Sequence, residues 1–210
     1  MAALTLEYLK TLSKQDRLTK ILIESSKCEK DPKHTIVNYF TLIDPILSKR
    51  ISVKLYPYQD KAIDDFENYD ADLTMKTRQT GMTTITELYV AWFMATKENQ
   101  VINILAQEKK TSRKFLRDVR KILDDARLRA PWLIPWYLDG QNGRESFALT
   151  NNSSIMAEAN KPDACRGDVI NLLVIDESIS LSTKVLVKNK KTSEIKKVKI
   201  GDIFYDETYK

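Results

Sequence analysis

Cysteine and histidine are scarce in this sequence, which has 2 cysteines and 1 histidine among 210 residues. The two cysteines, Cys28 and Cys165, are too few for a disulfide framework. They form no CxxC pair, and neither has a zinc-site spacing to His34, the single histidine. We therefore expect neither a zinc site nor a Ser-His-Asp triad.

Long hydrophobic runs are also missing. No stretch approaches the roughly 20 apolar residues that a membrane-spanning helix needs. The first residues, MAALTLEYLK, lack the basic, then apolar, then small-residue order of a signal peptide. With 5 glycines, 6 prolines, 42% hydrophobic and 30% charged residues, the composition is that of an ordinary globular protein. We expect a cytoplasmic protein without a membrane partner.

The formal charge of +5 is unevenly distributed along the chain. Residues 178–210 hold eight lysines and four acidic residues, a net charge of +4, which leaves +1 for residues 1–177. Nucleic-acid binding by the larger part therefore cannot be inferred from its net charge.

Short apolar runs alternate with amphipathic segments after residue 71. Apolar runs at 73–75, 101–105 and 170–175 predict strands, and the spacing over 85–93 and 115–126 predicts two helices. Residues 146–149 and 154–157 could be further short strands. The alternation of strands and helices predicts an α/β fold with a parallel sheet, in which 170–175 is a buried strand. Before residue 71, residues 3–25 show helical spacing, and Asp31-Pro32 indicates a break.

The segment 76–84, KTRQTGMTT, lies between a predicted strand and a predicted helix, where a phosphate-binding loop must lie. Such a loop directs backbone N–H groups and a helix N-terminus at phosphates, while a hydroxyl coordinates Mg²⁺. The motif lacks the first glycine of GxxxxGK[ST], and Met82 stands at the usual lysine position. A simple turn before an N-capped helix is the alternative interpretation.

The run 172–177, LLVIDE, is an apolar strand that ends in two carboxylates. A buried strand would hold them at the carboxyl edge of the sheet, where open α/β folds bind ligands. Asp176 would then hold Mg²⁺ through water, and Glu177 would orient and deprotonate the attacking water. An acidic turn after an ordinary strand is the alternative.

A third feature is Gln59, in the segment 55–59, LYPYQ, some twenty residues ahead of the loop and just before a predicted helix at 61–66. A glutamine side chain both donates and accepts hydrogen bonds, so it could recognise the edge of adenine and select ATP.

In their order and spacing, these motifs resemble the large terminase subunit of tailed bacteriophages, a DNA-packaging motor. The resemblance also includes the strand at 101–107, the basic helix after it, NNSSI at 151–155 and Arg166-Gly167. The resemblance runs from about Val53 to Glu177. It implies an incomplete P-loop NTPase domain of the additional-strand type over 53–177, after an N-terminal helical region at 1–52. In the complete protein, a coupling motif and an RNase-H-like nuclease would follow.

The resemblance also implies ATP and Mg²⁺ as cofactors, and double-stranded DNA, the portal and the small terminase subunit as partners. It implies that Gln59 recognises adenine and that Thr83 and Asp176 hold Mg²⁺. Glu177 would activate the attacking water. The phosphates would be bound by the loop residues Lys76, Arg78, Gln79, Gly81, Thr83 and Thr84. Because Met82 carries no charge, we expect Arg78 to neutralise the phosphates, with Lys76 as the alternative.

Residues 178–210 resemble the first block of an intein, a short β-rich fragment of the HINT type. They contain a nucleophile position at Ser178, a strand TKVLV at 183–187 and the turn IGDI at 200–203. The Oγ of Ser178 would attack the carbonyl of Glu177 and convert the amide into an ester. No histidine follows residue 178, so the remaining intein residues would come from a separate C-terminal chain, as in a split intein.

Other interpretations remain open. The tail could be a native β-hairpin of a truncated P-loop ATPase or helicase-like fragment. The absence of a lysine at Met82 favours a third possibility, a non-catalytic nucleotide-binding or adaptor module.

Overall fold

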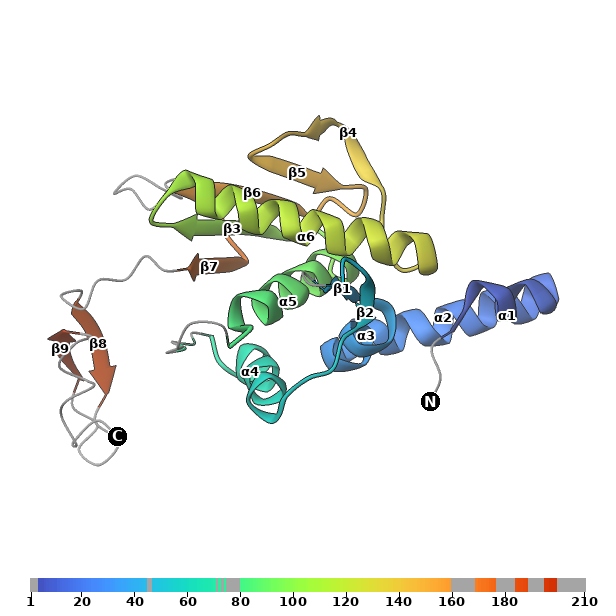
Figure 1. Ribbon diagram of the computed structural model, residues 1–210, viewed down its shortest axis with the longest axis horizontal. Helices are drawn as coiled ribbons and strands as arrows, with labels where there is room; N and C mark the ends of the chain where they lie inside the picture. Colours follow the sequence, from blue (N-terminus) through green and yellow to red (C-terminus); the bar gives the residue numbers. More distant parts are fainter. Residues whose placement is uncertain are drawn as a thin grey trace.

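The computed structural model describes residues 4–44, 47–70, 72, 74, 80–159 and 169–176, together with the strands at 184–188 and 195–199. Figure 1 shows their arrangement. The helices are α1 (Leu6–Thr11), α2 (Lys14–Lys30), α3 (Pro32–Tyr39), α4 (Pro57–Asn68), α5 (Met82–Thr96) and α6 (Lys109–Arg129). The strands are β1 (Thr41–Ile43), β2 (Arg50–Ser52), β3 (Val101–Ala106), β4 (Tyr137–Asn142), β5 (Ser146–Leu149), β6 (Ser154–Ala159), β7 (Leu172–Asp176), β8 (Lys184–Lys188) and β9 (Ile195–Lys199).

The main sheet has five strands in the order β4-β5-β6-β3-β7. Strand β3 lies between β6 and β7 and is parallel to both. Strands β4 and β5 pair antiparallel with each other, and β5 pairs antiparallel with β6. A pair β1-β2 forms a separate two-stranded sheet.

Helix α5 is buried on nearly all sides, as its sequence predicts. Leu88, Val90, Ala91, Trp92 and Met94 are fully inaccessible to solvent. One side of α5 packs against α6 and another against α3, so this helix lies at the centre of the molecule. A helix that is apolar all round is stable only in such a position.

Helix α6 is amphipathic and covers the sheet at β3 and β6 (Figure 1). Its buried apolar side chains recur at helical spacing, while most of its Lys, Arg and Asp residues lie on the solvent side. Arg127 is the exception and is buried. The buried apolar residues of α6 are Phe115, Leu116, Val119, Ile122, Leu123 and Ala126.

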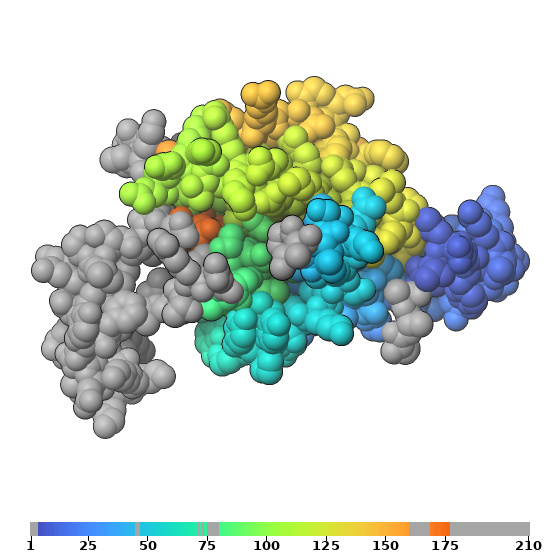
Figure 2. Space-filling view, in the orientation of Figure 1, coloured from blue at the N-terminus to red at the C-terminus, as the bar shows by residue number. Residues whose placement is uncertain are grey.

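Helix α2 ends and α3 begins where the sequence predicts a break. Asp31 follows the last residue of α2, and its carboxylate accepts a hydrogen bond from the backbone N–H of His34, which caps α3. Pro32 occupies the first turn of α3, where its missing N–H is not needed. Figure 2 shows α1 and much of α2, in blue, extending beyond the rest of the molecule.

The predicted N-terminal region at 1–52 shares a hydrophobic core with the main sheet and its helices. Cys28, Ile36, Tyr39 and Phe40 belong to the same hydrophobic cluster as the buried residues of α5, α6 and the sheet. The region is also not wholly helical, because residues 41–52 contain the β1-β2 pair.

The α/β class is confirmed, but the main sheet is mixed rather than parallel. Four residues connect β5 to β6, and so short a connection permits only antiparallel pairing. The expectation of a buried strand at 170–175 also needs correction. Leu172 and Val174 pack against the core. Leu173 and Ile175 point to the opposite face of the sheet, and each is 45% exposed.

The expected tail strand is present as β8, which pairs antiparallel with β9 in a two-stranded sheet separate from the main one. In the part of the chain that the structure describes, no helix combines the length and apolar character needed to cross a membrane.

Candidate functional site

The predicted metal-binding residues meet at one edge of the main sheet. Strands β3 and β7 end side by side, with Ala106 paired to Asp176. The first turn of α5 reaches the same edge, and Thr83 Oγ1 donates a hydrogen bond to Asp176 Oδ2 over 3.5 Å. These residues are 93 positions apart in the sequence. A hydroxyl and a carboxylate thus converge where the carboxyl ends of parallel strands place ligand sites.

Gly81 allows the chain to enter α5 at this point. It is the N-cap of the helix and has a φ of 72°, in the left-handed region that favours glycine. A Cβ at this position would lie 2.9 Å from Nε2 of Gln59. Both the backbone conformation and the close neighbour therefore favour glycine here. Thr84, in the first turn of α5, is partly buried.

Gln59 links α4 to the segment that leads into α5. Its side chain is buried, and Oε1 accepts a hydrogen bond from the backbone N–H of Tyr56 over 3.1 Å, which caps α4. Its Nε2 donates to the carbonyl oxygen of Thr80 over 3.2 Å. The predicted adenine-recognition residue therefore lies beside the predicted phosphate loop, with its amide engaged in protein contacts.

Two exposed tyrosines accompany Gln59. The rings of Tyr56 and Tyr58 are nearly parallel, with centroids 5.8 Å apart and an interplanar angle of 4°. The hydroxyl of Tyr58 donates a hydrogen bond to the carbonyl oxygen of Thr80 over 2.8 Å. Both rings lie within the segment LYPYQ, from which only Gln59 was predicted to contact the nucleotide. Together they present flat aromatic surface beside the start of α5.

A buried carboxyl group lies one helical turn beyond Thr83. Glu87 is 6% exposed. Burial is the main cause that raises the pKa of its carboxyl to about 8, and the negative charges of Asp118 and Asp176 act in the same direction. Lys114 and Lys121 oppose them in part. No sequence motif pointed to Glu87, because only the folded α5 brings it near Asp176 and α6.

Met82, at the position where the loop usually has lysine, is the first residue of α5 and is buried. An apolar side chain in this position contributes packing and no charge. Any cation for the phosphates must therefore come from elsewhere.

Five predicted site residues lie outside the described residues: Lys76, Arg78, Gln79, Glu177 and Ser178. The structure thus brings together Gln59, Gly81, Thr83 and Asp176, while the choice between Arg78 and Lys76 stays a prediction. A scan against models of known protein families finds no match to this chain.

Proposed function

We propose that residues 53–177 form the nucleotide-binding front half of a DNA-packaging ATPase of the large terminase type. The observation that carries this proposal is the contact between Thr83 and Asp176. A hydroxyl at the start of a helix and a carboxylate at the end of a parallel strand are the two Mg²⁺ ligands that P-loop NTPases use.

The donor atoms of this pair fit a magnesium ion. Hydroxyl and carboxylate oxygens are the hard ligands that Mg²⁺ prefers. Thr83 Oγ1 lies 3.5 Å from Asp176 Oδ2, so Thr83 would bind the ion and Asp176 would hold it through a bound water. When bound, Mg²⁺ would neutralise charge on the phosphates of ATP.

The base of the nucleotide would lie near Gln59 and the tyrosine pair. The ring of Tyr58 is anchored through its hydroxyl to Thr80, directly before Gly81, so its exposed ring lies close to the phosphate loop. Aromatic rings stack on nucleobases whatever their hydrogen-bonding edge. Stacking on Tyr56 or Tyr58 would therefore supply affinity, whereas an amide such as Gln59 would supply the preference for adenine.

We propose further that residues 178–210 are the N-terminal fragment of a split intein. The sequence match at Ser178, 183–187 and 200–203 supports this reading, and the strand pair β8-β9 forms a sheet separate from the main one. Splicing would join Glu177 to the remainder of the motor supplied by a second chain. With a net charge of +4, the fragment suits an acidic partner, because opposite charges speed association.

A trans-splicing assay tests this proposal. The chain is mixed with the candidate C-terminal chain, and the ligated product is followed on a gel and by mass spectrometry of the peptide that spans the new junction after Glu177. We expect ligation with loss of residues 178–210, no ligation with Ser178→Ala, and equal or faster ligation with Ser178→Cys, since a thiolate is the better nucleophile. A mature motor that retains residues 178–210 would contradict the intein proposal.

The buried Met82 favours a second candidate function, nucleotide binding without hydrolysis. Steady-state ATP turnover by the spliced protein distinguishes an ATP-hydrolysing motor from a module that only binds nucleotide. We expect turnover after ligation and little from the chain alone, because the second chain would supply the strands beyond the acidic strand and the coupling segment, which wall the ATP site in the proposed motor. Tight ATP binding without turnover in the ligated protein would favour the non-catalytic module.

A further inference from the structure

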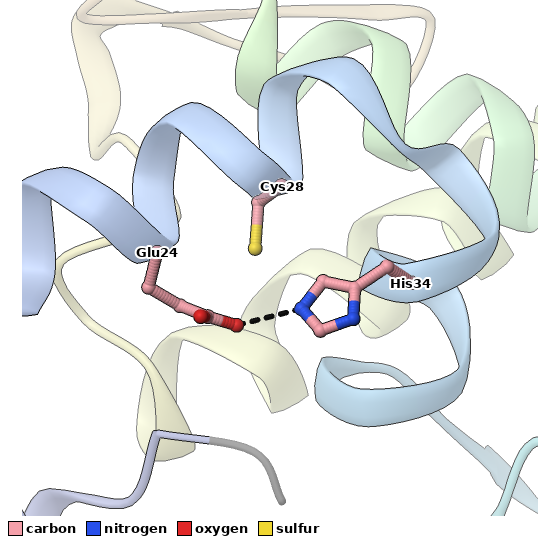
Figure 3. A group of neighbouring side chains, drawn as sticks. All are labelled: Glu24, Cys28 and His34. Carbon is pink, nitrogen blue, oxygen red and sulfur yellow. Dashed lines mark hydrogen bonds and ion pairs between the residues drawn. The ribbon is translucent and has the colours of Figure 1, made fainter. Parts of the chain in front are cut away.

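A second group of chemically capable side chains lies far from the nucleotide site, where α2 meets α3. Glu24 and Cys28 are one turn apart on α2, and His34 projects from the first turn of α3 toward them (Figure 3). One ligand atom from each residue lies within 4.8 Å of the other two. Because the chain reverses at Asp31 and Pro32, residues without any recognisable zinc-site spacing converge here.

The three side chains point into one shared space, as Figure 3 shows. Glu24 Oε1 lies 2.6 Å from His34 Nε2 and accepts a hydrogen bond from the Tyr39 hydroxyl over 2.8 Å. Cys28 is fully buried, and burial raises the pKa of its thiol to about 12. Burial disfavours the charged form of Glu24, but the hydrogen bonds from His34 and Tyr39 outweigh this and lower the pKa of its carboxyl.

We propose that Glu24, Cys28 and His34 bind a zinc-class divalent cation. Thiolate, imidazole and carboxylate are the three side-chain groups that Zn²⁺ selects. A thiolate and a carboxylate together balance its two charges, so the occupied site would be neutral, which favours a buried position. The side chains of His34 and Glu24 remain 9% and 18% exposed, enough for water to complete a tetrahedral site.

Such a cation would hold the N-terminal helices together and fix them to the centre of the molecule. The carbonyl oxygen of Cys28 accepts hydrogen bonds from Trp92 Nε1 of α5 over 2.7 Å and from Thr35 Oγ1 of α3 over 2.9 Å. Cys28 is therefore the point where α2, α3 and α5 meet. We assign the cation a structural role, because nothing about the cluster connects it to the reacting atoms of ATP.

Binding requires two proton movements. The Cys28 thiol releases its proton to solvent as the sulfur–metal bond forms. His34 must present the lone pair of Nε2 to the metal, so its proton moves to Nδ1, and Nε2 and Glu24 Oε1 separate from 2.6 Å. Asn38 Nδ2 lies 3.1 Å from Nδ1 and donates to the His34 carbonyl over 2.7 Å. The Asn38 amide must therefore turn to accept from Nδ1–H, which opposes binding.

Cobalt provides the direct test, because Co²⁺ occupies zinc sites and a thiolate ligand gives it a near-ultraviolet charge-transfer band. The full chain, treated with a chelator and reduced, is titrated with Co²⁺ and then with Zn²⁺. We expect one equivalent of Co²⁺ to produce the band, Zn²⁺ to abolish it, and Zn²⁺ to raise the melting temperature. These readouts depend on neither ATP nor splicing, so a negative result would contradict the metal site without contradicting the proposed function.

Matched variants identify the ligands. Cys28→Ser should remove the charge-transfer band, whereas Cys165→Ser, which changes the other cysteine, should keep it. His34→Gln and Glu24→Gln should keep some band but weaken Co²⁺ affinity about tenfold or more, and Asn38→Asp should strengthen it about tenfold by accepting from Nδ1–H. Far-ultraviolet circular dichroism checks that each variant is folded. The proposal is overturned if the wild-type chain gives no band, or if the band survives Cys28→Ser or disappears with Cys165→Ser.

Discussion

Gln59 donates a hydrogen bond from Nε2 to the carbonyl oxygen of Thr80, which joins the first turn of α4 to the residue before Gly81. The same amide caps α4 through Oε1. The position of the loop at the start of α5 therefore depends on a side chain that lies more than twenty residues upstream. A change at either end of this contact should alter both stability and nucleotide binding.

The first prediction concerns Gly81. Alanine there must adopt a φ of 72°, at a cost of about 1 to 2 kcal/mol, and its Cβ would displace the Gln59 amide from Thr80, which costs about 1 kcal/mol more. Gly140→Ala is the matched control, because Gly140 has a φ of 76° and no atom within 4 Å of its Cβ position. Urea unfolding should show the larger loss for Gly81→Ala. Equal losses would show that the Gln59 contact is energetically unimportant.

Asp176→Asn should weaken binding of ATP in the presence of Mg²⁺ about tenfold or more, because a neutral amide holds a hydrated cation less strongly than a carboxylate does. Without Mg²⁺ the affinity should change little. Fluorescence titration with a labelled ATP analogue measures both values. Asp139→Asn, an exposed change on β4, serves as the control. A loss of equal size with and without Mg²⁺ would argue against a metal-binding role for Asp176.

Glu87→Gln should stabilise the protein in alkaline solution. The pKa of Glu87 in the folded state, about 8, lies above its ordinary value of 4.5. The folded protein therefore holds this proton more tightly than the unfolded chain, and stability falls as pH rises from about 4.5 through 8. Asp118, Asp176, Lys114 and Lys121 act on the same group and shape the curve.

Glutamine carries no titrating proton, so the variant should lack this decline. The gain in unfolding free energy should be small near pH 5 and should reach roughly 2 to 4 kcal/mol near pH 8.5. Chemical unfolding at both values measures it, with the exposed Glu108→Gln as the control. A gain that does not change with pH would mean that Glu87 is not protonated in the fold.

Arg78→Ala, made in the spliced motor, should lower the ATPase rate by about 10² or more if Arg78 supplies the charge that Met82 lacks. This factor of about 10² is the usual loss of rate when one hydrogen-bond donor to the transition state is removed. Lys76→Ala is the comparison at the other candidate position. If Lys76→Ala causes the larger loss of kcat, the role belongs to Lys76.

Local patterns in the sequence correctly predicted most of the regular elements. The apolar spacing of α6, the all-round apolar character of α5 and the Asp31-Pro32 break were sufficient, because each depends on residues a few positions apart. Strands β1, β2 and β4 were not predicted. Strand β4, YLDGQN, contains charged and polar residues and a glycine, and it is stabilised by pairing with β5 rather than by its own propensity.

The identities and order of the candidate site residues were determined by the sequence: Gln59 first, then the loop that contains Gly81 and Thr83, then Asp176. Their meeting was decided by the tertiary structure. Only the parallel register of β3 and β7 brings Asp176 to the edge where α5 begins, 93 residues from Thr83. The same holds for Glu24, Cys28 and His34, whose spacing indicated no metal site. Side chains distant in sequence become neighbours only when helix packing and strand register, set by burial of the whole core, bring their backbones together.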